Sequence, residues 1–588
     1  DIDDAVSMRR TAGGFALGVH IADVAQFVVP GSATDGEARA RGTTVYLADR
    51  RFNMIPEVLS ERVCSLRGGQ DRYAVSVIWD LDAQYRARGV WFGRTLIRSA
   101  CEMHYEQAQA LLDGARGVEG LDPAMEDALR AGVVELTRAM RALRERRRAA
   151  GALELASSEV KFAFDPRTHA VAEMAPKAGL EIHRVIEEAM VFANAAVARR
   201  IHQAFPAAAL LRRHRSPTPE RFERLARAVR AKGFEIDASS NAALARSLQA
   251  IAAAATAKDP ELVFLAKSMA TLAMQEAEYF ATGDCAGTAD FAHYGLAEPF
   301  YTHFTSPIRR YADIIVHRQL LAALAQESAA AEGGPAAVVE ARQWVGGAAA
   351  QLNERNRQSK LAQRESTELF QSRYVAQRTL GAGESLVADG VVAEVRTNGL
   401  IVYVPRFGIR GPVHLRDKAG NINLPLSALS GNARDIDRHI DGCTDFDVDA
   451  SRLSIRLPIN APVFHLGDPV LRFAVFDRVK VALRVLETRR RRPPVYLTLV
   501  SRGSTSVKDV KAYRSTLAPL DRRLHLSAAS AKQRAASDPE PPLDAATVAA
   551  TGGSRKPKKR PAVDYYAVLE KFGDLSLLET RCEPQSLQ

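Results

Sequence analysis

The stretch Phe15-Ala-Leu-Gly-Val-His-Ile-Ala-Asp23 alternates apolar side chains with small or polar ones. The same period of two continues in Thr43-Thr-Val-Tyr-Leu47 and in Tyr73-Ala-Val-Ser-Val-Ile-Trp-Asp80. Alternation of this kind, rich in β-branched and aromatic residues, is typical of strands with one buried face. We therefore predict a sheet in this part of the chain, to which Trp91-Phe-Gly-Arg-Thr-Leu-Ile-Arg-Ser99 adds another strand.

After this sheet the hydrophobic period changes to that of helices. Ala, Leu, Glu and Arg recur in long stretches at a spacing of three to four residues, which favours amphipathic helices. The predicted helices cover residues 105 to about 155, 181–202, 219–232, 241–256, 261–279 and 341 to about 377. With the sheet, they predict one large α+β domain over residues 1–380.

Beyond residue 381 the period returns to two. Short strands are predicted at 385–395, 399–404, 411–415, 478–486 and 495–500. Five short strands can close a small β-barrel of the OB-fold type, so we predict a second domain over residues 384–503 with a polar insertion at 416–466. Residues 504–588 are rich in Ser, Ala, Pro, Lys and Asp, which predicts a low-complexity basic tail with one helix at 563–580.

The composition favours an anionic partner. Among 588 residues, 80 Lys and Arg face 69 Asp and Glu, which gives a formal net charge of +11. The five cysteines lie far apart without a C-x-x-C pair, which argues against a disulfide framework or a zinc module. No stretch of eighteen mainly apolar residues occurs, so we expect no membrane-spanning helix. In the tail, Arg555-Lys-Pro-Lys-Lys-Arg560 fits a nuclear localisation signal or, equally well, a solvated linker.

The first four residues, Asp1-Ile2-Asp3-Asp4, crowd three carboxylates at the edge of a strand. Crowded like charges are costly unless protons or a cation neutralise them. Magnesium is a hard ion that prefers carboxylate oxygens and keeps waters for substrate phosphates, so it fits such a group. The alternative is a solvated acidic loop, which short acidic strings often form.

The segment Tyr301-Thr-His-Phe-Thr-Ser-Pro-Ile-Arg-Arg-Tyr-Ala-Asp313 contains a helix start, because Ser306 and Pro307 suit an N-cap and the first helical position. This prediction places Arg309 and Arg310 in the first helical turn. Cations there oppose the helix dipole, so a phosphate bound at this end would explain them. The alternative is that they pair with Asp313 or with other acids on a solvated face.

Several further positions are ambiguous from the residues alone. Tyr105 begins a predicted helix, where its ring can stack on a base or simply pack. We interpret His20, within an apolar strand, as a hydrogen-bonded structural histidine, and we interpret His183 and Glu187 as an ordinary helical pair rather than metal ligands. The loop Arg489-Arg-Arg-Arg492 fits a phosphate-contacting loop or a solvated turn.

Taken together, these stretches resemble the RNase II / RNase R family, whose catalytic domain is called RNB. The resemblance extends from Asp1 to about Gly503. It is carried by the acidic start, by Gly18-Val-His-Ile-Ala-Asp-Val, Arg41-Gly-Thr-Thr-Val-Tyr-Leu-Ala-Asp-Arg-Arg, Cys64-Ser-Leu, His293-Tyr-Gly-Leu-Ala and residues 301–313. Forms such as Glu181-Ile-His-Arg-Val-Ile-Glu-Glu, Leu210-Leu-Arg-Arg-His and Glu278-Tyr-Phe-Ala-Thr-Gly are more similar to the eukaryotic branch, typified by the catalytic subunit of the RNA exosome.

The resemblance implies an RNB catalytic domain followed by an RNA-binding barrel of S1 type. It implies processive 3′-to-5′ hydrolysis of single-stranded RNA to nucleoside 5′-monophosphates, with magnesium, or manganese as a substitute. The metal role falls on Asp1, Asp3 and Asp4, with Asp4 also catalytic. Arg309 and Arg310 are assigned to the scissile phosphate and Tyr105 to the terminal base. The exosome core is an implied partner, and the nucleus, nucleolus or cytoplasm the implied location.

One departure from the family pattern concerns the metal site. The family has another aspartate six positions before the residue that matches Asp1, and the given sequence does not include that position, so the implied metal site is incomplete in it. It also does not include the N-terminal cold-shock barrels that family members carry. The exosome subunit has, in addition, a second nuclease domain that tethers it to the core. Because the sequence starts at Asp1 rather than at a methionine, we expect the natural N-terminus to lie upstream. The rival hypotheses are a catalytically inactive RNA-binding relative and a subunit of an RNA-processing assembly.

Overall fold

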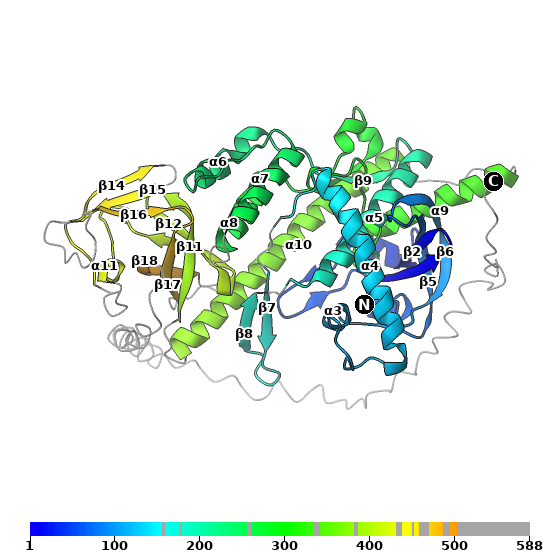
Figure 1. Cartoon of the computed structure of the whole chain (residues 1–588), viewed down its shortest axis with the longest axis horizontal. Coiled ribbons are helices and arrows are strands. Elements are labelled where there is room, and N and C mark those ends of the chain that lie inside the picture. The colour runs from blue at the N-terminus through cyan, green and yellow to red at the C-terminus, as the bar shows by residue number, and fades with distance from the viewer. Residues whose placement is uncertain are drawn as a thin grey trace, which may run out of the picture. The chain divides into compact units, whose positions relative to one another are not determined.

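The computed structural model describes ten stretches of the chain (Figure 1). They are residues 1–155, 159–176, 179–255, 260–332, 341–381, 386–430, 438–449, 452–457, 470–485 and 494–502. The predicted tail at 504–588, with its helix and its basic motif, lies outside the described residues, as does the arginine loop at 489–492. In the stretches that the structure describes, no helix has the length and apolar character needed to cross a membrane.

The N-terminal sheet is antiparallel throughout, as the alternating pattern predicts. Its strand order is β1 (Asp4–Thr11), β2 (Gly14–Ala22), β5 (Asp71–Leu81) and β6 (Ala87–Arg98). The predicted strand at 43–47 is not part of this sheet. Its central residues form β3 (Val45–Tyr46), which pairs only with β4 (Arg51–Phe52) in a short hairpin.

One face of this sheet carries the main hydrophobic core. Leu17, Val19 and Ile21 alternate along β2 and are fully buried. Helices α5 (Glu181–Ala204) and α9 (Tyr311–Glu332) pack against the sheet, and the ring of Trp79 stacks on Phe192 of α5 at 4.6 Å between centroids. Burial of this face fixes the strand register, because a slip by one residue would expose the whole apolar row.

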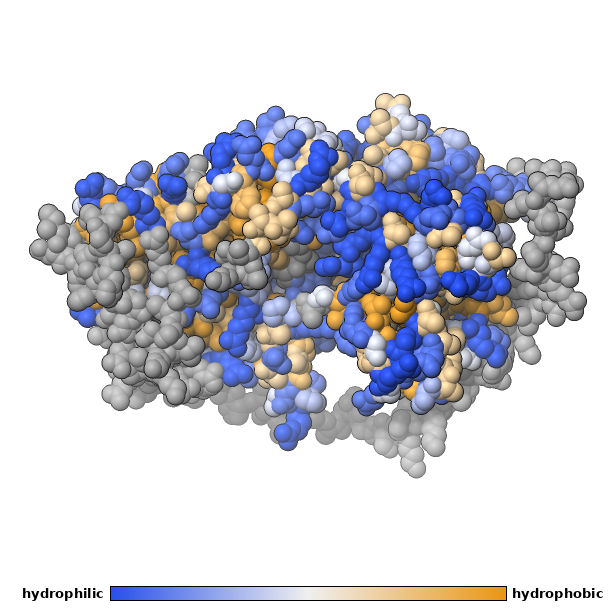
Figure 2. Space-filling view, in the orientation of Figure 1, coloured by the Kyte–Doolittle hydropathy of each residue, from blue (hydrophilic) through white to orange (hydrophobic). Residues whose placement is uncertain are grey.

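The prediction of a single helix from residue 105 to about 155 is wrong. The structure has α3 (Tyr105–Leu112) and α4 (Pro123–Ala149) with a loop between them. Gly114 and Gly117 take positive φ angles of 86° and 64° in this loop, which ends the first helix. Asp122 then caps α4 by accepting a hydrogen bond from the Ala124 amide at 2.9 Å, ahead of Pro123 at the first helical position. Hydrophilic side chains gather along α4 in Figure 2.

The helix predicted at 261–279 also ends early. Helix α8 (Pro260–Ala273) is followed by strand β10 (Glu278–Ala281), which pairs with β9 (Leu210–Arg213). Tertiary pairing with β9 therefore overrides the local helical spacing. The other predicted helices are present, with short elements added before and between them. The helices predicted at 219–232, 241–256 and 341 to about 377 contain α6 (Glu223–Arg230), α7 (Asn241–Ala254) and α10 (Arg342–Ala376). The short helices α1 (Val24–Phe27) and α2 (Ala33–Arg41) were not predicted.

The second sheet contains the five strands that the sequence predicts. Its order is β13 (Ile409–His414), β12 (Gly399–Val404), β11 (Leu386–Arg396), β17 (Arg478–Val485) and β18 (Val495–Arg502). The sheet curls so that its two edge strands approach each other. The close approach is seen at Gly411 of β13, where an added Cβ would lie 3.2 Å from the side chain of Leu497 of β18. This curled half-barrel is consistent with an OB-type fold.

Two smaller sheets accompany these domains. The predicted insertion contains β14 (Thr444–Asp449) and β15 (Arg452–Arg456), and their sheet also takes in β16 (Val470–Ala474). The hairpin β7 (Val160–Phe164) and β8 (Val171–Pro176) was not predicted. Its side chains share a hydrophobic cluster with α10 and the curled sheet, where Phe164 meets Phe370 edge to face at 5.2 Å.

Candidate active site

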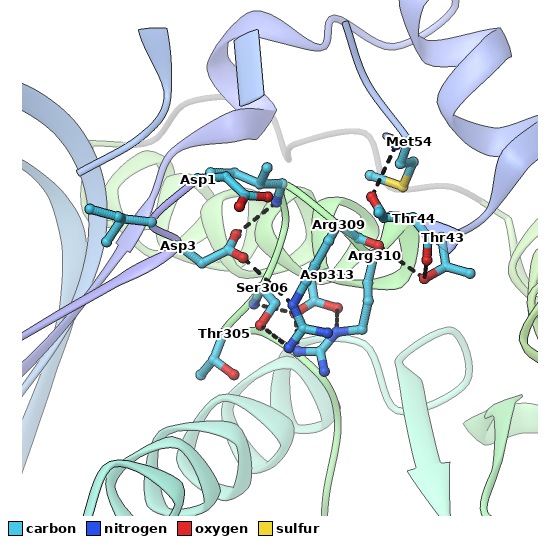
Figure 3. A network of polar contacts seen from close by, with 12 residues as sticks. Asp1, Asp3, Thr43, Thr44, Met54, Thr305, Ser306, Arg309, Arg310 and Asp313 are labelled. Atoms are coloured by element: carbon cyan, nitrogen blue, oxygen red, sulfur yellow. Dashed lines mark hydrogen bonds and ion pairs between the residues drawn. The ribbon is translucent and has the colours of Figure 1, made fainter. Parts of the chain in front are cut away.

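The acidic start of the chain is held in place by backbone hydrogen bonds to distant segments. The Ala22 amide donates to the Asp3 carbonyl at 2.9 Å, and the Leu66 amide donates to the Ile2 carbonyl at 3.0 Å. The Asp3 carboxylate accepts a hydrogen bond from the Ile308 amide at 2.9 Å (Figure 3). Thus the first strand and the segment at 301–313 meet at Asp3, although 305 positions separate the donor from the acceptor.

Asp3 is a buried carboxylate and Asp4 a partly buried one, and little positive charge balances them. Burial raises the pKa of Asp3 to about 7, with the Ile308 amide and Arg309 opposing the shift and the charge of Asp4 adding to it. Burial also raises the pKa of Asp4, again opposed by Arg309. One guanidinium therefore serves two carboxylates. A second cation at this place would relieve the imbalance.

The side chain of Asp1 has a cationic partner of its own. Its Oδ1 accepts from Nη1 of Arg51 on β4 at 2.7 Å, and Arg51 also pairs with Glu61. Within the described stretches, no three His, Cys, Asp or Glu side chains are arranged as a ready metal site. The oxygen donors and the charge deficit of Asp3 and Asp4 fit a hard cation such as magnesium, whereas Asp1 already has a cationic partner.

The structure corrects the predicted start of the helix that follows Ser306. Helix α9 begins at Tyr311, so Arg309 and Arg310 lie in the turn before it and not in its first turn. The Arg310 amide donates to the Ser306 carbonyl at 3.0 Å, which closes this turn. Asp313, in the first turn of α9, accepts from the Ser306 amide at 2.7 Å and thereby holds the turn against the helix (Figure 3).

The two arginines of this turn have different surroundings. Arg310 donates from Nε and Nη2 to the fully buried Asp313 carboxylate at 2.8 and 2.7 Å. Burial opposes the charged form of Arg310, but this ion pair raises the pKa of its guanidinium. Arg309 is 40% exposed, and its Nε lies 3.8 Å from Asp3. The pairing with Asp313 that the sequence left as an alternative thus applies to Arg310, although it is buried rather than solvated.

Tyr105 lies close to the same carboxylates. It is the first residue of α3, as predicted, and its side chain is 45% exposed. Burial raises the pKa of the Tyr105 phenol, with Asp4 adding to the shift and Arg309 opposing it. The edge of the His183 ring meets the ring of Tyr105 at 4.4 Å. An exposed phenol ring beside the carboxylates is placed to stack on a base.

Both histidines interpreted as structural have structural partners. His20 lies between Ser7, at 2.9 Å from its Nε2, and Ser76, at 2.7 Å from its Nδ1. His183 accepts a hydrogen bond from the Leu180 amide at 3.2 Å and so caps the start of α5. These contacts confirm the structural interpretation of His20 and give His183 a helix-capping role.

Tyr46 of the β3–β4 hairpin was not predicted as a site residue. Burial raises the pKa of its phenol, and the charges of Arg309 and Asp3 both act on it, which places Tyr46 beside the carboxylates. It is 36% exposed. Its only local signal is a tyrosine in the alternating stretch at 43–47, and that signal does not separate a site residue from a strand residue. The hairpin reaches the site because the Thr44 amide donates to the Arg309 carbonyl at 3.0 Å.

Comparison with known protein families identifies both domains. Residues 1–326 match the RNB domain, and residues 386–493 match an S1 domain of the Rrp44 type. The chain belongs to the RNB family of exoribonucleases.

Two curated relatives show how far the similarity extends. Exosome complex exonuclease RRP44 homolog A of Arabidopsis thaliana is 38% identical over 501 residues, which cover 85% of this chain and 48% of the relative. The human exosome complex exonuclease RRP44 is 36% identical over 419 residues, covering 71% of this chain and 41% of the relative. The chain thus spans about half the length of the curated relatives it matches.

Solved structures share the fold at lower identity. RNase R of Mycoplasma genitalium in complex with ribose-methylated single-stranded RNA has a TM-score of 0.66 and 20% identity, over 85% of this chain and 69% of that chain. Yeast Ssd1, described as a pseudonuclease, has a TM-score of 0.65 and 18% identity, over 84% and 65%. A nuclease and a pseudonuclease fit almost equally well, so the fold alone does not decide catalysis.

Proposed function

We propose that this chain is a magnesium-dependent exoribonuclease that hydrolyses single-stranded RNA processively from its 3′ end and releases nucleoside 5′-monophosphates. One observation carries the proposal: the buried carboxylate of Asp3, the partly buried carboxylate of Asp4 and the half-exposed guanidinium of Arg309 converge beside the exposed ring of Tyr105. This group joins a carboxylate pocket that lacks positive charge to a phosphate-binding cation and a base-stacking ring.

Each of these residues has a defined part in the proposed reaction. Asp3 and Asp4 would hold magnesium, which lowers the pKa of a bound water and neutralises charge on the phosphodiester. Arg309 donates hydrogen bonds to the scissile phosphate and stabilises the negative charge that develops at phosphorus. Tyr105 stacks on the terminal base and fixes the 3′ end. Arg310 does not contact the phosphate in the proposed reaction, because both donor groups of its guanidinium bind Asp313. Arg310 positions the turn instead.

The partners and location follow the resemblance and the printed names of the relatives. Relatives that are 38% and 36% identical to this chain over the aligned residues are named exosome complex exonucleases. We infer that the chain acts in RNA processing and decay, in the nucleus or the cytoplasm, with an exosome core as a partner. Manganese would replace magnesium, because it also accepts carboxylate and water ligands.

The rival function is RNA binding without catalysis. It is favoured by the similarity to the yeast pseudonuclease, which has nearly the same TM-score as the RNase R structure. It is disfavoured by the presence of Asp3, Asp4 and Arg309, because a protein without hydrolysis gains nothing from a buried Asp3 carboxylate beside the like charge of Asp4.

The test is the degradation of a 5′-labelled single-stranded RNA with magnesium, with and without chelator. The chain is assayed as it stands and, where its gene encodes residues before Asp1, with those residues included. Asp3→Asn is expected to abolish shortening of the labelled strand while RNA binding persists. The matched control is Asp71→Asn, which removes a half-exposed carboxylate paired with Arg98 at the edge of the same sheet. RNA that is bound but stays intact at every magnesium concentration would establish the binding protein instead.

A further inference from the structure

Helices of the RNB domain cover part of the curled S1 sheet. The ring of Phe264 on α8 stacks on Tyr403 of β12, with 4.9 Å between centroids and 17° between planes. Tyr403 is 8% exposed and belongs to a hydrophobic cluster that also contains Leu265 and Ile401. On this face the sheet therefore uses the ring of Tyr403 for packing and not for stacking on a base.

Three arginines meet around one carboxylate at the rim of this covered face. Arg224 of α6 lies 2.6 Å from Oε2 of Glu394, and Arg410 of β13 lies 3.7 Å from the same oxygen. Arg396, at the end of β11, lies 3.4 Å from Oε1. We call Arg224, Arg396 and Arg410 the arginine triad; one member comes from the RNB domain and two come from the S1 sheet.

The triad carries more charge than its carboxylate can neutralise. Burial lowers the pKa of Arg410, and the charges of Arg224 and Arg396 lower it further against the pull of Glu394. The three guanidinium side chains are accessible, since Arg224 is 49%, Arg396 54% and Arg410 34% exposed. A surplus of accessible cations held close together attracts an anion with several negative charges.

The triad differs from the other ion pairs between the same two domains. Lys232, just after α6, faces Asp477 at 3.3 Å, and Arg478 faces Glu261 of α8 at 2.9 Å. In the Lys232 pair, one cation meets one carboxylate. If the triad served only to join the domains, a single arginine beside Glu394 would be sufficient, because additional cations repel each other.

We propose that the arginine triad binds the phosphate backbone of single-stranded RNA outside the catalytic pocket, so that the S1-type sheet and the RNB helix α6 form one composite phosphate site. The identity of the ligand rests on the proposed function. Guanidinium groups form paired hydrogen bonds with phosphate oxygens. Successive phosphates of one strand supply the negative charge that three arginines need beyond the single charge of Glu394. The site reads no base and should accept any sequence.

The test measures RNA affinity without magnesium, so that no strand is degraded. The probe is a long unstructured RNA at several salt concentrations, compared with a trinucleotide that cannot occupy the catalytic pocket and the triad together. Arg410→Gln and Arg396→Gln are each expected to weaken binding of the long RNA several-fold and to leave the trinucleotide affinity unchanged. The slope of log affinity against log salt should fall in magnitude by about 0.7 for each phosphate that a variant no longer neutralises.

Two further variants separate binding from a purely structural role. Glu394→Gln should strengthen binding of the long RNA, because it removes the carboxylate that competes with phosphate. If the triad only joined the two domains, this substitution would remove the shared ion-pair partner and weaken RNA binding. Lys232→Gln removes an ion pair between the same domains at a site without surplus charge, so it should leave both affinity and salt slope unchanged. The thermal midpoint of each variant shows that it is folded.

The outcomes distinguish this proposal from the proposed enzymatic function. If RNA is bound through the triad but never degraded, the proposed phosphate site is supported and the proposed exoribonuclease activity is overturned. If RNA is degraded while the triad variants bind RNA as tightly as the wild type, the proposed exoribonuclease activity is supported and the proposed phosphate site is overturned. Equal losses of affinity in Arg410→Gln and Lys232→Gln, or weaker binding in Glu394→Gln, would likewise overturn it.

Discussion

The pocket at the start of β1 and the arginine triad at the rim of the S1 sheet are charged in opposite senses. In the pocket, Asp3 and Asp4 share Arg309; in the triad, three guanidinium groups share Glu394. Each place keeps an excess of one sign in partly dry surroundings, which costs folding free energy. The opposite signs mean that the missing counter-charge has different chemistry at the two places: a metal cation at the first and a row of phosphates at the second.

Arg310 is the arginine of the active-site turn whose charge is fully matched, so its removal should have the largest effect on stability. Arg310→Ala leaves the buried Asp313 carboxylate without its partner, and we expect a loss of about 3–5 kcal/mol in the free energy of unfolding. Denaturant titration measures it. A loss below about 1 kcal/mol would show that the pair is no more than a surface ion pair.

The neighbouring Arg309 should behave in the reverse way. Because its side chain is half-exposed and lies 3.8 Å from Asp3, Arg309→Ala should lower the unfolding free energy less than Arg310→Ala does and lower the rate of RNA cleavage by about 10²–10³-fold. Single-turnover cleavage with saturating enzyme gives this rate. Arg309→Lys is the informative control, since lysine keeps the positive charge but cannot form the paired hydrogen bonds of a guanidinium. Full activity in Arg309→Ala would remove this residue from the mechanism.

Tyr105 tests whether the acidic pocket, unlike the triad, holds a base as well as a phosphate. Tyr105→Ala should weaken binding of a short RNA by about 1–3 kcal/mol, the usual contribution of one stacked base. Tyr105→Phe should bind as the wild type does, because the ring is retained and only the hydroxyl is removed. Fluorescence anisotropy without magnesium makes the measurement. If both variants weaken binding equally, the phenol hydroxyl rather than stacking is responsible.

The smallest expected effect concerns the uncompensated charge of the pocket itself. The pKa of Asp3 is about 7 in the folded chain and 3.8 when unperturbed, so its contribution to stability is complete below pH 4 and is lost as the pH rises through 7. Magnesium should therefore raise the thermal midpoint by a few degrees at pH 8 and hardly at all at pH 5. In Asp3→Asn the response to magnesium should disappear. An equal response at both pH values would contradict a site built on this carboxylate.

Much of the fold follows from local patterns. The alternation in β2 and β5 predicts the N-terminal sheet, and the five strands of the S1 sheet appear where the period of two returns. Local patterns fail where distant pairing decides. Residues 278–281 become a strand because β9 lies beside them, and the break between α3 and α4 depends on glycine conformations that helical spacing does not reveal.

The site was only partly predictable for the same reason. Motifs predict Asp3, Asp4, Arg309 and Tyr105, and the structure brings these residues together. The different surroundings of Arg309 and Arg310 were not foreseeable, because adjacent identical residues carry no local signal of which one meets Asp313. The arginine triad was also not predictable, since Arg224 lies far from Arg396 and Arg410 in the chain and no motif joins the three.

The hydrogen bond from the Ile308 amide to Asp3 has a consequence for protein synthesis. Donor and acceptor are 305 positions apart, and a ribosome that adds roughly 5–20 residues per second needs about 15–60 s to travel between them. During that interval the first strand is outside the ribosome without the turn that completes its pocket. Under the proposed function, a nascent chain therefore lacks the complete site for RNA cleavage until the turn at 306–310 has been made, and the order of translation delays the onset of activity by this interval.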